Sequence, residues 1–186
     1  MHSVAAVLVT ALLAIVLYHA ALLRRKKIAA FVRGGEYAAF AAYYCLFVYA
    51  VYAGTFGLPF PEALIRPWFT GSFPEGAGAA LCLAGVAGYA VSAAHLRDSY
   101  RIGIDETTPG PLVTSGIFAH SRNPIYISLL SLYLGLFCVY ANAALLINLA
   151  LSVAIIHRQV LREEKFLREL RKDAYLEYCA RVPRYL

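Results

Sequence analysis

The stretch whose residue types are best suited to binding or catalysis is residues 114–126. It reads Thr-Ser-Gly-Ile-Phe-Ala-His-Ser-Arg-Asn-Pro-Ile-Tyr. Gly116 permits a tight turn, and Pro124 suits the first turn of a hydrophobic helix with Asn123 as its cap. The start of a helix binds anionic groups because it presents free N–H groups and a positive dipole end. On local residues alone, an ordinary helix cap with Arg122 reaching to the membrane surface explains the stretch equally well.

A second polar stretch begins at His157, directly after a long apolar run. On a helix, Gln159 and Glu163 lie one turn apart on one face, and Glu164 is spaced to pair with Arg168. Ionisable groups this close to a membrane boundary are costly unless they face a cavity or pair with one another. A solvated amphipathic helix with routine salt bridges is the plainer interpretation of these residues taken alone.

The tail of the chain is rich in tyrosine and arginine, with Tyr175, Tyr178 and Tyr185 among its residues. Tyrosine is enriched where membranes meet water, because one end of its side chain is apolar and the other is polar. We therefore expect the tail to anchor at the membrane interface, and we expect no catalytic role for any single tyrosine in it.

Composition places these stretches in a membrane protein. Of the 186 residues, 61% are hydrophobic and only 15% are charged, which is more apolar material than a soluble domain of this size needs. The apolar residues also form long runs, as transmembrane helices require. The net charge of +6 is therefore expected to reflect basic loops and contact with anionic lipid instead of nucleic-acid binding.

The apolar runs predict an all-α integral membrane bundle of five transmembrane helices. The first run is expected to be a retained span and not a signal peptide, because its basic flank follows it. The run 125–156 is too long for one span, so we expect a helical hairpin broken near Asn142, followed by a cytoplasmic C-terminal helical segment. Small residues in the third span favour close helix–helix contact. The predicted spans are 3–23, 37–58, 76–96, 124–139 and 143–156.

The basic residues predict the orientation. With five spans and the N-terminus outside, all of the 17 lysines and arginines except Arg66 fall on one side, Lys27 and Arg33 among them. The positive-inside rule assigns that side to the cytoplasm. We therefore expect the two large polar segments, 97–123 and 157–186, to meet at the cytoplasmic face.

Other kinds of site find no support in the sequence. The five histidines are scattered without ligand spacing, so no metal site is expected. No Gly-x-Gly-x-x-Gly follows a predicted strand, which argues against a Rossmann-type nucleotide site. The cysteines have no Cys-x-x-Cys spacing, and we expect them to be small buried hydrophobic residues. They are Cys45, Cys82, Cys138 and Cys179.

Taken together, the polar motifs resemble a known family. They comprise the 112–118 loop, the Arg-Asn-Pro-Ile-Tyr run at 122–126, a hydrophobic hairpin, the pair Glu163-Glu164, and a Tyr-x-x-Tyr-x-x-Arg-Val-Pro tail from Tyr175. In this order they resemble the isoprenylcysteine carboxyl methyltransferase family and its relatives, the phospholipid N-methyltransferases. Those families are integral membrane enzymes that use S-adenosylmethionine.

The resemblance implies roles for individual residues. Asn123 stands in the family's cofactor motif, where eukaryotic members have histidine and prokaryotic relatives often have asparagine. Glu163 falls at the acidic residue that holds the cofactor's amino group. The family's substrate-side arginine aligns at Gln159, and its neighbour Arg158 is our candidate for that catalytic role beside Glu163. The implied cofactor-binding residues are Leu112, Val113, Phe118, Arg122, Asn123, Pro124, Tyr126, Glu163 and Glu164.

The residue types agree with methyl transfer from a sulfonium, in which a protein mainly aligns and desolvates the nucleophile. We expect three N-terminal helices in residues 1–96 and a catalytic region in residues 97–186. The acceptor is expected to be a lipophilic carboxylate, thiol or lipid amine from the bilayer, and the sequence does not select among them. Two alternatives stay open: an NADPH-dependent membrane reductase related to steroid reductases, and a non-catalytic membrane transport or assembly protein.

Overall fold

The structure is a computed structural model that describes residues 2–26, 35–102, 104 and 109–186, and the elements in these residues are all helices. This confirms the predicted all-α class. Lys27 and Arg33, which count toward the predicted cytoplasmic charge, lie outside the described residues. The elements are α1 (His2–Arg25), α2 (Gly35–Phe56), α3 (Glu62–Ile65), α4 (Ser72–Leu96), η1 (Arg97–Ser99), η2 (Gly116–Ala119), α5 (Pro124–Tyr140) and α6 (Ala143–Arg181).

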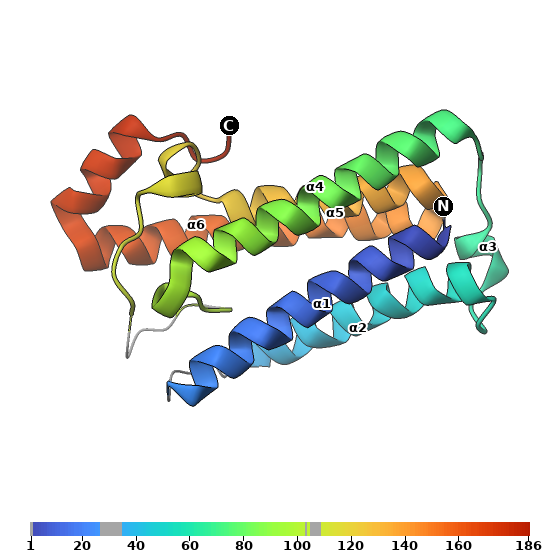
Figure 1. The fold of residues 1–186 in the computed structure, drawn as a ribbon, viewed down its shortest axis with the longest axis horizontal. Coiled ribbons are helices and arrows are strands. Elements are labelled where there is room, and N and C mark those ends of the chain that lie inside the picture. Colours follow the sequence, from blue (N-terminus) through green and yellow to red (C-terminus); the bar gives the residue numbers. More distant parts are fainter. Residues whose placement is uncertain (1, 27–34, 103, 105–108) are drawn as a thin grey trace.

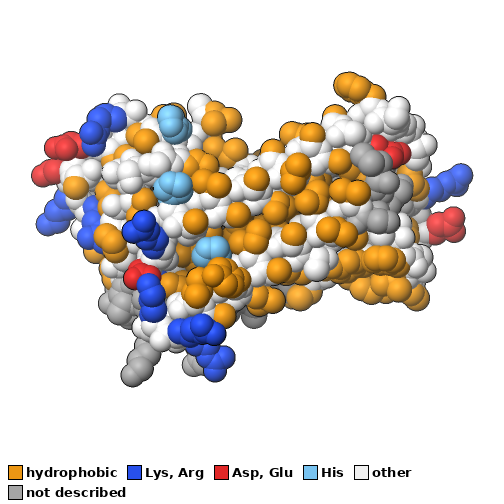
Figure 2. All heavy atoms as spheres, in the orientation of Figure 1, with side chains coloured by type: hydrophobic (Ala, Val, Ile, Leu, Met, Phe, Trp, Pro, Cys, Tyr) orange, Lys and Arg blue, Asp and Glu red, His pale blue; other side chains and the backbone are white. Residues whose placement is uncertain are grey.

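The long helices run back and forth along one axis of the molecule (Figure 1). Helices α1, α4 and α6 finish at the same end, and α5 begins there. Figure 2 shows that most of the visible basic side chains gather at that end, whereas hydrophobic side chains cover the middle of the molecule. The two polar segments that follow α4 and that close the chain therefore meet at one end of the bundle, as the charge pattern predicts.

Three helical stretches are long and apolar enough to cross a membrane: Ala6–Arg25, Ser72–Ser99 and Ala143–Arg181. Two shorter apolar helices, Ala42–Phe56 and Pro124–Tyr140, lie beside them. A protein with helices of this length and hydropathy is an integral membrane protein. The number of five spans stays a prediction, because only the three longer stretches are shown to be long and apolar enough to cross a membrane.

The predicted break in the apolar run 125–156 is confirmed. Ala141, directly after α5, adopts a left-handed conformation with φ 32° and ψ 56°. The side chain of Asn142 then accepts a hydrogen bond from the Leu145 N–H at 2.9 Å and caps α6. The segment before α4 packs onto this turn, since the Trp68 N–H donates to the Ala141 carbonyl at 2.9 Å.

Helices α4 and α5 approach closely through glycines, as the small residues in the third predicted span indicate. A Cβ on Gly85 would lie 2.6 Å from the Ser128 carbonyl oxygen, and one on Gly78 would lie 2.6 Å from the Gly135 carbonyl oxygen. Because the obstructing atoms belong to the backbone, neither position accepts a larger residue without moving a helix. This contact holds α5 in place and so positions the polar segment that precedes it.

Candidate active site

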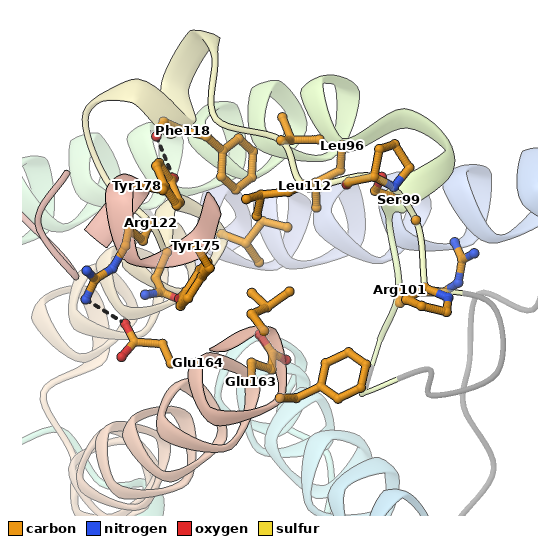
Figure 3. Close-up of a pocket in the computed structure, with 18 of the residues that line it drawn as sticks. Leu96, Ser99, Arg101, Leu112, Phe118, Arg122, Glu163, Glu164, Tyr175 and Tyr178 are labelled. Carbon is orange, nitrogen blue, oxygen red and sulfur yellow. Dashed lines mark hydrogen bonds and ion pairs between the residues drawn. The ribbon is translucent and has the colours of Figure 1, made fainter. Parts of the chain in front are cut away.

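At the polar end of the bundle, a cavity of about 210 Å³ lies between the segment after α4, the loop before α5, and α6 (Figure 3). All nine residues that the resemblance implies as cofactor ligands line this cavity. They are Leu112, Val113, Phe118, Arg122, Asn123, Pro124, Tyr126, Glu163 and Glu164. The side chain of Arg158, in contrast, is exposed and lies outside the lining. The structure therefore brings together the predicted cofactor residues but not the predicted substrate arginine.

Among the residues that the structure describes, the hydrogen-bond donors to the Glu163 carboxylate are neutral side chains. Its Oε1 accepts a 2.5 Å hydrogen bond from the Tyr126 hydroxyl and a 2.8 Å bond from the Gln159 Nε2. Its Oε2 has no partner among the residues that the structure describes. Glu163 lies on the charged part of α6, beyond the apolar stretch. Burial raises the pKa of Glu163, and the hydrogen bonds from Tyr126 and Gln159 offset part of the rise. One carboxylate oxygen is thus left for a cationic group in the cavity.

The neighbouring residue, Glu164, has the opposite surroundings. Its side chain is buried, and its carboxylate binds the guanidinium of Arg122 at 2.9 Å and that of Arg184 at 2.8 Å. Burial alone would raise the pKa of Glu164, but the hydrogen bonds and charges of Arg184 and Arg122 hold it below its ordinary value. The predicted pairing of Glu164 with Arg168 is wrong, because two arginines from sequence-distant segments take up both carboxylate oxygens.

Arg122 joins this ion pair to the tail of the chain. Its Nη1 donates to the Cys179 carbonyl at 3.3 Å, and its backbone N–H donates to the Pro183 carbonyl at 3.0 Å. The side chain is only 10% exposed, and its buried Nε has no partner in the described part of the chain. The alternative in which Arg122 simply reaches to the membrane surface is therefore wrong. The guanidinium forms part of the cavity wall, and its Nε–H remains as a hydrogen-bond donor without a partner among the described residues.

The start of α5 matches the prediction in its backbone but not in one side chain. Gly116 has a φ of +63°, which suits the predicted tight turn, and Pro124 is the first residue of α5. Asn123 occupies the cap position, but its side chain makes no capping hydrogen bond. Instead, its Nδ2 donates to the Arg184 carbonyl at 3.0 Å. The predicted side-chain cap is wrong because the amide is turned toward the tail that passes beside it.

A bend at Lys172, where φ is 45° and ψ is −121°, returns the last part of α6 to the cavity. Tyr175 and Tyr178 lie beyond the bend, are 1% and 3% exposed, and line the cavity. The Tyr178 hydroxyl donates to the Phe118 carbonyl at 2.6 Å (Figure 3). Burial raises the pKa of Tyr178 to about 12, so this hydroxyl stays a donor at neutral pH. The prediction that these tyrosines anchor the tail at a membrane interface is wrong, because they pack inside the protein.

Sequence reasoning also missed the part of the lining at the end of α4 and just after it. Leu96, Ser99 and Arg101 border the cavity there (Figure 3). Arg101 contributed to the sequence argument only as a cytoplasmic charge. Its position directly after a span, on the same predicted face as both polar motifs, is the signal that could have placed it at the site.

The cysteines do not line this cavity. All four cysteines are free, and Cys82 is buried as predicted, but Cys45 is exposed on α2. An apolar residue of a membrane helix need not face the protein interior, because the surrounding lipid is apolar as well. Among the residues that the structure describes, no group of three or more His, Cys, Asp or Glu side chains could hold a metal ion.

Comparison with known families identifies the class of protein. Residues 74–173 match the model of the phospholipid methyltransferase family, which is more than half of the 186-residue chain. The chain therefore belongs to the phospholipid methyltransferase family, and the resemblance drawn from its motifs is confirmed at the level of membrane methyltransferases. The searches of curated proteins and of solved structures gave no significant match. The matched region begins within α4, so the proposed division into residues 1–96 and 97–186 stays a prediction.

Proposed function

We propose that this protein is an S-adenosylmethionine-dependent methyltransferase that acts on a lipophilic acceptor supplied by the bilayer. The observation that carries the proposal is the convergence of the 112–126 segment and the Glu163-Glu164 pair on one cavity. These segments are separated by a whole helical hairpin, and the salt bridge between Arg122 and Glu164 joins residues 42 positions apart. Membership of the phospholipid methyltransferase family supports the same chemistry.

The charges around the cavity fit a zwitterionic amino acid. S-adenosylmethionine carries an ammonium and a carboxylate on its methionine part. The Oε2 of Glu163, which has no partner in the described part of the chain, is the acceptor that an ammonium needs. Arg122 offers the carboxylate a positive charge and an Nε that is likewise without a partner there. Glu164 is saturated by arginines, so in this proposal it shapes the site through Arg122 and does not contact the ligand directly.

The apolar side of the cavity fits the rest of the cofactor. Leu112, Val113 and Phe118 offer a flat apolar surface for an adenine ring, and Phe118 is buried. Tyr126, held by Glu163, presents an aromatic face beside the helix start at Asn123 and Pro124, where a sulfonium is attracted by cation–π interaction. When bound, the cofactor would supply an electrophilic methyl group on a sulfonium.

The work of the protein in such a reaction is to align the acceptor and to exclude water. The cavity walls are largely apolar, and the tail closes one side of them through Tyr175 and Tyr178. An acceptor held in line with the methyl group gains from orientation, because a bimolecular step becomes effectively unimolecular. A carboxylate or thiolate acceptor needs no strong base, whereas an amine must first lose a proton. Arg158 stays our candidate for contact with the acceptor's polar group, since its side chain is exposed and it directly precedes Gln159, which donates to Glu163.

We also propose that the cavity faces the cytoplasm, with the N-terminus outside. The basic side chains at the cavity end of the bundle support this orientation (Figure 2). Reporter fusions to the two termini test it: a fluorescent protein that folds only in the cytoplasm should be bright at the C-terminus and dark at the N-terminus. The reverse pattern would overturn the orientation without touching the enzyme assignment.

Calorimetry of S-adenosylhomocysteine binding in detergent tests the cofactor assignment. The wild-type protein should bind, and Glu163→Ala should lose a charge-assisted hydrogen bond of about 1.5–3 kcal/mol, which raises Kd by about ten- to a hundred-fold. Glu169→Ala removes an exposed carboxylate from the same helix and should leave Kd unchanged. Equal affinity of the Glu163 variant and the wild type would remove Glu163 from the site.

Thermal shifts with two nucleotides separate this proposal from its alternatives. S-adenosylhomocysteine should stabilise the protein and NADPH should not, because only ligands that bind the folded state raise its melting temperature. Stabilisation by NADPH alone would favour a membrane reductase. Stabilisation by neither would favour a non-catalytic transport or assembly protein.

A further inference from the structure

A second cavity of about 320 Å³ lies on the outer side of α4 and α5. Its walls come from both helices and from Tyr185 near the end of the tail, and they are almost entirely apolar. We call this cavity the α4–α5 groove; its lining consists of Leu81, Ile127, Leu130, Ser131, Leu134 and Tyr185.

The groove runs along one face of α5. Ile127, Leu130, Ser131 and Leu134 recur with helical spacing and therefore line one face. Seven residues of α-helix rise about 10 Å, so the groove extends from near the start of α5 toward the middle of its apolar stretch. The hydroxyl of Ser131 donates to the Leu81 carbonyl at 2.9 Å. Because this hydroxyl is already hydrogen-bonded, the wall of the groove offers little to a polar group and suits a hydrocarbon chain better.

The groove adjoins the candidate active site at two places. Tyr126 lines the active-site cavity, and the next residue, Ile127, lines the groove. Arg184 binds Glu164 of the active-site cavity, and the next residue, Tyr185, closes the groove. The Tyr185 hydroxyl lies 2.9 Å from the Nδ1 of His157, so the groove has one polar end, and that end is the one beside the active site.

We propose that the α4–α5 groove binds one acyl chain of the lipid acceptor, with the lipid's polar group at the end marked by Tyr185. This inference rests on the proposed function, because it names the part of the acceptor that the enzyme recognises. The position of the groove beside the active-site cavity, given by the adjacent residues Tyr126 and Ile127 on α5 and Arg184 and Tyr185 in the tail, is what selects this occupant. A chain lying along α5 toward Leu134 would bring its own headgroup to the residues around Tyr126 and Arg184.

Photo-crosslinking locates the chain directly and does not depend on turnover. The full-length protein in nanodiscs would receive a small fraction of phosphatidylethanolamine that carries a diazirine in one acyl chain. After illumination, mass spectrometry should find crosslinks concentrated on the groove residues of α4 and α5. Crosslinks spread evenly over the lipid-facing residues of all helices would show ordinary surrounding lipid only and would overturn the proposal.

A matched pair of variants sharpens the test. Leu134→Trp fills the groove at a position that is 42% exposed and should abolish the concentrated crosslinks. Leu151→Trp makes the same change on α6, outside the groove lining, at a position that is 47% exposed; the crosslinks should persist. An unchanged map in the Leu134 variant would count against the groove.

Measurement of S-adenosylhomocysteine binding on the same samples distinguishes two failures. If the cofactor analogue binds and the crosslinks are uniform, the groove assignment alone is wrong. If the crosslinks concentrate in the groove and the analogue does not bind, the groove assignment stands as a lipid site and the proposed methyltransferase function is wrong.

Discussion

The contact between α4 and α5 and the contact between the 116–124 segment and the tail are built on different physical principles. The first, which we call the glycine interface, relies on close backbone approach at Gly78, Gly85 and Gly135. The second, the polar junction, relies on Glu164 held between two arginines, with backbone carbonyls of the tail as further acceptors. Each contact positions one side of the candidate active site.

The difference follows from the surroundings of each contact. Between helices in a membrane, lipid is as apolar as leucine, so association depends on close packing and small residues instead of on hydrophobic burial. At the polar end, segments that lack regular structure must satisfy their backbone groups and hold their positions by directed bonds. A buried carboxylate with two guanidinium partners fixes the positions of both arginines, because each of its oxygens accepts directed hydrogen bonds.

The largest effect is expected at the polar junction. Glu164→Ala would leave Arg122 and Arg184 without their shared partner, and removal of one member of a buried ion pair costs about 3–5 kcal/mol. Thermal unfolding in detergent should show a large drop in melting temperature. Glu169→Ala is the matched control, because that carboxylate is 69% exposed and lies 4.0 Å from Lys165; its effect should stay within about 0.5 kcal/mol. Equal melting temperatures would mean that the junction does not hold the fold.

A smaller loss is expected at the glycine interface. Gly85→Ala would place a Cβ 2.6 Å from the Ser128 carbonyl oxygen and 2.8 Å from the Leu132 nitrogen, and such overpacking costs about 1–3 kcal/mol. The melting temperature should fall by about 2–4 °C for each kcal/mol. Gly76→Ala, where nothing lies within 4 Å of the added atom, should be neutral or slightly stabilising. Similar losses in both variants would contradict close packing as the cause.

Acid should weaken the polar junction and spare the glycine interface. Arg184 and Arg122 hold the pKa of Glu164 below its ordinary value, against the effect of burial. A carboxyl whose pKa is lowered by folding stabilises the protein above its unfolded pKa, and this stability is lost as the pH falls through the folded pKa. Comparison of melting temperatures across the acid range should therefore show a steeper fall for the wild type than for Glu164→Gln. Parallel curves would show that Glu164 is not the titrating group.

The smallest effect is expected at the bend of α6. Lys172 has a positive φ, which costs a residue with a side chain about 1 kcal/mol. Lys172→Gly should therefore leave stability unchanged or raise it slightly, although glycine normally weakens helices. Lys165→Gly, at a regular position of the same helix, should cost about 1 kcal/mol. If both glycines destabilise equally in thermal unfolding, the bend carries no strain.

Local pattern was enough to predict much of the fold. The break at Asn142 was predictable because an apolar run of that length suits no single span and a capping residue lies near its middle. The close approach at Gly85 was predictable because small residues gather in the third apolar run. Such features depend on near neighbours along the chain, which a sequence displays directly.

Local pattern did not predict which of the two carboxylates is bound by arginines and which is bonded by neutral side chains. Glu163 and Glu164 are adjacent and chemically identical, so no local pattern tells which one is saturated. The answer depends on Arg184, which is 20 residues away, and on Arg122, which is 42 residues away. The bend at Lys172 that brings the tail back is equally hidden, because lysine is an ordinary helix former.

By itself, the amino-acid sequence determined an all-helical membrane protein whose two polar motifs lie at one end, and its resemblance to a family of membrane methyltransferases implied nine of the residues that line the candidate active-site cavity. Hydropathy, glycine placement and residue type suffice for the fold, since they act over a few turns of helix, whereas the cavity residues rest on the ordered motifs of the resemblance. Only the tertiary structure decided that the tail folds back to seal the site, that Glu164 is engaged by arginines and that Glu163 keeps an open oxygen. Those outcomes depend on contacts between groups that lie far apart in the sequence, and the spacing of residues along the chain does not show which of these groups meet in the folded state.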